Sequence, residues 1–86
     1  MVLNNADLYT TVQALSKELR KAGEEQWSSA LNDAMSISTV PGEVLGETRL
    51  QLQKLQTSQV PAIQALKWQV DEALSYLDKV LGPSDA

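Results

Sequence analysis

Apolar residues recur along the chain at intervals of three and four, which is the spacing that places side chains on one face of an α-helix. Phenylalanine is absent, β-branched residues rarely cluster, and no run alternates apolar with polar residues as a half-buried strand would. The pattern predicts an all-α fold, either a four-helix antiparallel bundle or two helical hairpins. The predicted helices span about residues 5–22, 24–36, 43–57 and 61–81.

The first two predicted helices are separated by Gly23. Asn4, followed three residues later by Asp7, predicts an N-terminal cap for the first helix. The apolar faces of the two helices are Leu8, Val12, Leu15, Leu19 and Ala22, and then Trp27, Ala30, Leu31, Ala34 and Met35. The second face is out of register with the first, so we expect a turn at the glycine and not one bent helix. Trp27 is interpreted as a core residue because it lies on its own apolar face.

Prolines and glycines bound the second pair of helices. Pro41 and Gly42 indicate a loop that leads into the third helix, and Pro61 is expected in the first turn of the fourth. The expected apolar positions are Leu45, Thr48, Leu52 and Leu55 in the third helix, and Ile63, Leu66, Val70, Ala73, Leu74, Leu77, Val80 and Leu81 in the fourth. Gly46 would allow another helix to approach closely. The short connection predicts an antiparallel hairpin, followed at residues 84–86 by a frayed tail.

Composition restricts what this fold can do. A chain of 86 residues has room for one helical domain, residues 1–86, with a thin core. It holds neither cysteine nor histidine, so we expect no disulfide, no metal site and no cofactor. Eleven acidic and seven basic residues produce a net charge of −4, which disfavours nucleic acid as a partner. The basic cluster Lys17, Arg20 and Lys21 is interpreted as complementing the dipole of the first helix at its C-terminal end.

Candidate catalytic groups are few. The commonest general base and the commonest thiol nucleophile are missing. Ser16 and Lys17 are adjacent, but neighbouring residues on a helix point in different directions. The carboxylates that could share a surface of the second hairpin are Glu43, Glu47, Asp71, Glu72 and Asp78. Di-iron bundles combine such groups with Glu-x-x-His pairs, which this chain cannot form, so we interpret the carboxylates as solvated and expect no enzymatic activity.

The fourth predicted helix carries a second row of residues on the side away from its apolar stripe, and Leu50 is likewise opposite the apolar seam of the third helix. Two interpretations remain open for this row. The first two helices cover it, or it contacts another chain through aromatic residues of the kind enriched in interfaces. The predicted partner-binding residues are Leu50, Ala65, Trp68, Glu72 and Tyr76.

No motif of a known family is evident, and two functions agree with these features. The first is a non-enzymatic protein–protein interaction module, a homodimer that self-associates through the hairpin of residues 43–81. The alternative is a small acidic immunity or antitoxin-type protein that binds a partner toxin. No apolar stretch approaches the roughly 20 residues needed to cross a bilayer, and no basic segment followed by an apolar run opens the chain. We therefore expect a cytoplasmic protein without membrane contact.

Overall fold

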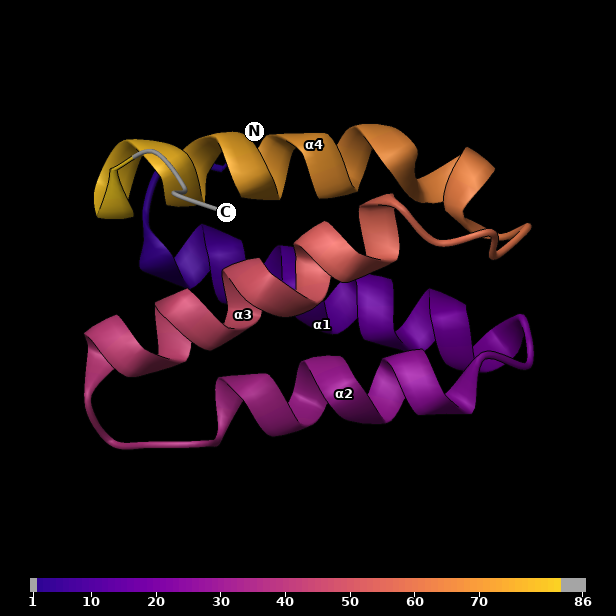
Figure 1. Ribbon diagram of the computed structural model, residues 1–86, viewed down its shortest axis with the longest axis horizontal. Coiled ribbons are helices and arrows are strands. Elements are labelled where there is room, and N and C mark those ends of the chain that lie inside the picture. Colours follow the sequence, from indigo (N-terminus) through magenta and orange to yellow (C-terminus); the bar gives the residue numbers. More distant parts are fainter. Residues whose placement is uncertain (1, 83–86) are drawn as a thin grey trace.

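The computed structural model describes residues 2–82, and the tail expected at 84–86 lies outside this range. The described residues form α1 (Asn5–Lys21), α2 (Glu25–Met35), α3 (Pro41–Gln56) and α4 (Ile63–Leu81). Consecutive helices run in opposite directions (Figure 1). Each helix packs against the next one along the chain, and α4 also packs against α1, so the four close into a bundle. The predicted all-α fold is confirmed.

The turn between α1 and α2 depends on Gly23. Its backbone φ of 83° lies in the left-handed region that glycine adopts without steric cost. The Glu24 N–H donates to the Leu19 carbonyl at 2.8 Å, and the Gly23 N–H donates to the Arg20 carbonyl at 3.1 Å. This pair of bonds is the Schellman motif, which ends a helix at a left-handed residue. The expected break into two helices is therefore confirmed.

Both ends of α1 carry the groups predicted for them. Asn4 Oδ1 accepts a hydrogen bond from the Asp7 N–H at 2.8 Å, and Asp7 Oδ2 accepts one from the Leu3 N–H at 3.0 Å. The first bond satisfies a donor that a helix N-terminus leaves without an intrahelical partner, and the second joins the segment before α1 to the first turn of the helix. Arg20 and Lys21 lie in the last turn, where positive charge complements the helix dipole.

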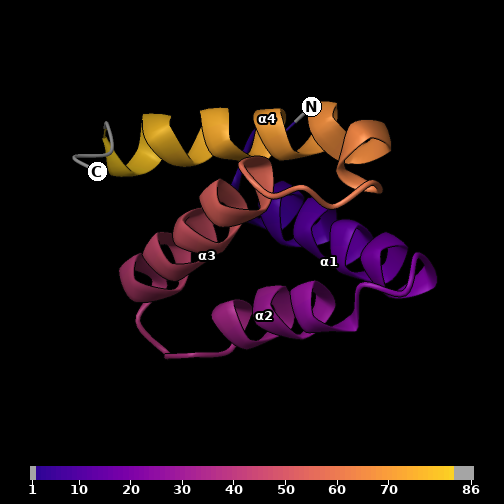
Figure 2. The same ribbon diagram turned by 45° about the vertical axis from the view of Figure 1, so that its right-hand side comes forward.

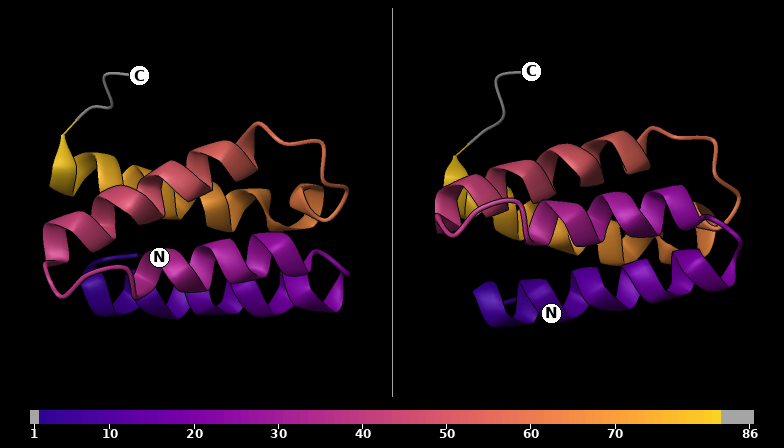
Figure 3. Two further views of the ribbon diagram at one scale, coloured as in Figure 1. Left: turned by 60° about the horizontal axis from the view of Figure 1, so that its bottom comes forward. Right: turned by 90° about the horizontal axis from the view of Figure 1, so that it is seen from below.

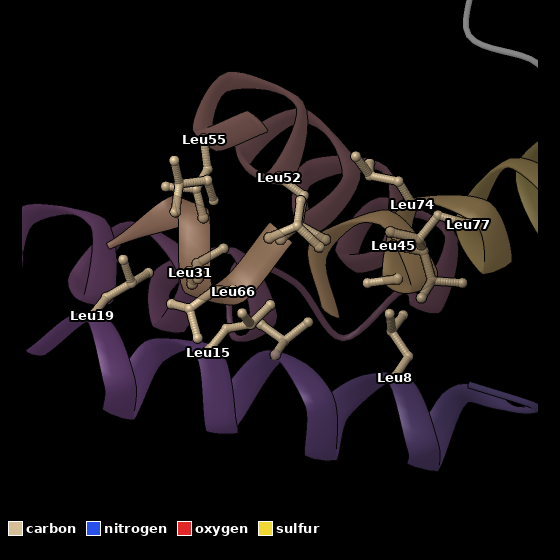
Figure 4. Close-up of a cluster of buried hydrophobic side chains, with 14 residues drawn as sticks. Leu8, Leu15, Leu19, Leu31, Leu45, Leu52, Leu55, Leu66, Leu74 and Leu77 are labelled. Atoms are coloured by element: carbon tan, nitrogen blue, oxygen red, sulfur yellow. The ribbon is translucent and has the colours of Figure 1, made fainter. Parts of the chain in front are cut away.

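One apolar core fills the space between the four helices. In Figure 4, Leu8, Leu15 and Leu19 project from α1 towards leucines of the other three helices. Leucine dominates this core, and the residues of the core cluster lie on the predicted apolar faces of all four helices. In Figure 2, α4 lies at the top and α2 at the bottom, with α1 and α3 on opposite sides between them, and Figure 3 shows α3 crossing α4 at an angle.

Two predicted core positions are wrong, because each lies where its helix runs out of neighbours. Ala22 is exposed, since it is the residue at which α1 ends. Val80 is 47% exposed although it continues the apolar stripe of α4. The Tyr76 hydroxyl bonds to Asn5, the first residue of α1, so the last turn of α4 extends past the end of that helix.

The helix boundaries of the second hairpin also differ from those predicted. α3 begins at Pro41, two residues earlier than expected, since proline suits the first helical position. α4 begins at Ile63 and not at Pro61, because the preceding bonds, such as that from the Ile63 N–H to the Val60 carbonyl, span only three residues. A Cβ added to Gly46 would meet nothing within 4 Å, so no helix approaches closely there.

A buried pair of serines joins α1 to α2. Ser16 Oγ lies 2.7 Å from Ser28 Oγ and donates to the Ser28 carbonyl at 3.2 Å. Because Ser28 faces α1, the buried face of α2 is centred away from Trp27 and Met35, which pack against the core from its edge and stay partly exposed. Ser16 is therefore a packing residue whose partner is Ser28. This agrees with the expectation that Ser16 and the adjacent Lys17 point in different directions on the helix.

Candidate functional site

The outer face of α4 carries the most exposed aromatic residue of the described chain. Trp68 is 61% exposed, and Ala65, one turn earlier, is exposed as well. Val70, two residues further on, is fully buried, and two residues correspond to slightly more than half a helical turn. Since Val70 points into the core, Trp68 has to point away from it. Coverage by the first two helices, one of the two open interpretations, does not apply to Trp68.

Tyr76 has a different environment from Trp68. Its ring is partly buried and packs against the core, and its hydroxyl donates to Asn5 Oδ1 at the start of α1. Glu72, between the two aromatic residues, is half-buried. The second row is therefore divided: α1 partly covers its C-terminal end, and the end with Trp68 stays open.

Leu50 is separated from Trp68. It is 42% exposed on α3, and its neighbour Arg49 contacts Asp78 on α4 at 3.2 Å. Leu50 therefore lies level with Asp78, ten residues along α4 from Trp68, which corresponds to roughly 15 Å of helix. The predicted partner-binding residues do not form one continuous patch.

Polar contacts hold the α3–α4 hairpin together along one side. Arg49 donates to the Gly82 carbonyl at 2.6 Å and to Asp78 Oδ1 at 3.2 Å, so its positive charge lies at the C-terminus of α4, where the helix dipole favours it. Near the other end, the Gln56 amide donates to Asp71 Oδ1 at 2.8 Å. Two of the candidate carboxylates thus take part in holding the hairpin.

A groove runs beside the outer face of α4. It has a volume of about 260 Å³ and is lined by Val2, Leu3, Glu72, Ser75, Tyr76 and Lys79. The segment before α1 forms one wall, and Leu3 in it remains 70% exposed. Sequence reasoning missed this segment. Its one signal is an apolar residue directly before the N-cap, a position that often packs against the following helix.

Two further hollows lie elsewhere on the surface. One, of about 370 Å³, lies between α3 and α4 beside Gln56 and Asp71, and the other, of about 360 Å³, lies between α1 and α2 beside Tyr9 and Met35. Within residues 2–82, no group of three or more acidic side chains is placed to hold a metal ion. No helix in the described part of the chain is both long and apolar enough to cross a membrane.

Comparison with known proteins adds no relative. No protein-family model, curated protein or solved structure matches this chain.

Proposed function

We propose that the chain is a non-enzymatic protein–protein interaction module that self-associates through the α3–α4 hairpin, with the outer face of α4 at the centre of the contact. The observation that carries the proposal is the exposure of Trp68, of which 61% is open to solvent. A tryptophan side chain buries roughly 150–250 Å² when covered. At about 25 cal/mol per Å², covering the open part would contribute about 2 to 4 kcal/mol to association.

The surroundings of Trp68 suit a contact between proteins. A small apolar neighbour, Ala65, is exposed beside it, and charged side chains follow along the same helix at Glu72 and Lys79. An aromatic anchor bordered by polar residues is the usual composition of an interface. A second copy of the chain is the simplest partner, since most soluble oligomers are symmetric assemblies of one chain.

Two further features belong to the proposal. The partner is a protein and not a nucleic acid, because the net charge of −4 repels a phosphate backbone. The chain acts in the cytoplasm, which fractionation of cells that express it would test. In the alternative function, an immunity or antitoxin-type protein, the toxin would be the partner that covers the same open surface.

The mass of the chain in solution tests self-association. Light scattering over a series of concentrations is expected to show a mass that rises from 9.4 kDa, the mass of one chain, towards twice that value. The rise follows from mass action, because covering Trp68 requires a second chain. A mass of 9.4 kDa at every concentration would contradict the proposal and leave an unlike protein as the partner of this surface.

A further inference from the structure

The outer face of α4 carries a second repeat with the spacing of a coiled-coil seam. Its members, at intervals of three, four, three and four residues, are Ala65, Trp68, Glu72, Ser75 and Lys79. This spacing aligns side chains in one stripe along a helix. The stripe has an aromatic residue, Trp68, near its N-terminal end, the negative charge of Glu72 in the middle and the positive charge of Lys79 at its C-terminal end. Such an order is self-complementary when two copies run in opposite directions.

We propose that two copies of this chain pair through their α4 helices in antiparallel orientation, with Trp68 of each copy against Lys79 of the other. In this register, Glu72 of one copy lies opposite Ser75 of the other and about one helical turn from its Lys79. The ammonium group then has both an indole face and a carboxylate within reach. The inference rests on the proposed self-association and adds its orientation and register.

The charges on the stripe disfavour the parallel arrangement. Parallel pairing in register would place Glu72 against Glu72 and Lys79 against Lys79, and like charges held together in an interface disfavour binding. Antiparallel pairing replaces both repulsions by attractions, and the two-fold symmetry forms each attraction twice.

The groove beside α4 provides a matching surface for the indole. Val2, Leu3, Tyr76 and Lys79 line it, and it lies at the end of the stripe that Trp68 of a second copy would reach. Leu3, which is 70% exposed, would gain an apolar neighbour on pairing. A standard interface buries roughly 800 Å² per partner, and one helix alone would bury less. The segment before α1 therefore enlarges the buried area.

Reversal of the two charges tests the register. Glu72→Lys and Lys79→Glu are each expected to weaken self-association about tenfold, because each brings like charges together across the interface. The double variant, which exchanges the charges, is expected to restore association to within about threefold of the original chain. Lys17→Glu, at an exposed position on α1, changes the net charge as Lys79→Glu does and is expected to leave association unchanged.

An engineered thiol tests, without any change of charge, whether the outer faces of two α4 helices meet. The chain has no cysteine, so Ser75→Cys introduces one thiol near the proposed two-fold axis, and oxidation is expected to produce a covalent dimer. Ser29→Cys, at an exposed position on α2, is the matched control and is expected to form no covalent dimer under the same conditions.

The outcomes separate the register from the function. If the chain associates but the double charge variant stays as weak as the single variants, or if Ser29→Cys crosslinks as readily as Ser75→Cys, the antiparallel register is wrong while self-association stands. If the original chain does not associate at all, the proposed function fails together with the register. Restoration by the exchanged charges, together with selective crosslinking at residue 75, supports the pairing.

Discussion

Replacing Leu15 with alanine is expected to lower the free energy of unfolding by about 3 to 4 kcal/mol. Leu15 is fully buried on α1 and belongs to the single core that all four helices share. Its neighbours include residues of other helices, which cannot close the resulting cavity without moving a whole helix (Figure 4). A domain of this size is stable by only about 4 to 13 kcal/mol, so the variant should lose roughly a quarter or more of its stability.

Urea denaturation followed by circular dichroism measures this loss. The experiment is performed at a concentration at which the chain is monomeric, since association would add to the apparent stability. Leu3→Ala removes the same atoms from a side chain that is 70% exposed, and its effect is expected to stay within about 0.5 kcal/mol. Equal losses in the two variants would show that α1 does not bury Leu15 in a shared core.

The second large effect is expected on association and not on folding. Trp68→Ser should weaken self-association about 30-fold or more, the size of effect found for a central aromatic residue of an interface. The free energy of unfolding of the monomer should change by less than about 0.5 kcal/mol, because the side chain is mostly open to solvent. Concentration-dependent light scattering and urea denaturation measure the two quantities separately.

The matched control for this variant is Ile37→Ser. Ile37 lies between α2 and α3 and is 59% exposed, nearly the same as the 61% of Trp68, but it is not part of α4. Its replacement is expected to leave association unchanged. If both variants weakened association equally, the contact would be a nonspecific apolar one, and the assignment to the outer face of α4 would be wrong.

The sequence predicted the helices well because their apolar residues are strictly periodic. Leu8, Val12, Leu15 and Leu19 recur at the spacing of one helix face and are all fully buried. Gly23 was recognisable as a helix end because it follows both the last apolar position and the basic last turn. These signals are local, so a single segment of the chain is enough to interpret them.

Features that depend on the relative position of two helices could not be predicted in this way. The apolar stripe of α4 includes Val80, but only the position of Asn5 beside Tyr76 shows that α1 begins one turn short of Val80. Ser16 and Ser28 interrupt the apolar pattern of their own helices. The burial of each serine is explained by the other, which lies within hydrogen-bond distance of it.

The candidate site shows the same limit. The direction of Trp68, away from the core, follows from its angular position on one helix, and the structure agrees with that direction. The contact of Arg49 with Asp78 shows which part of α4 lies beside Leu50. The periodicity of apolar residues does not predict this contact. Val2 and Leu3 form a wall of the groove beside α4. The path of their segment could not be predicted, because it has no helical repeat.

The fold leaves the outer face of α4 open, and a second copy is expected to cover it. Trp27→Phe leaves Trp68 as the one tryptophan of the chain, so iodide quenching of its fluorescence reports the exposure of this face alone. We predict strong quenching at low chain concentration and progressive protection as the concentration rises through the range in which the mass increases. Equal quenching at every concentration would contradict the claim, as would protection that is already complete in the monomer.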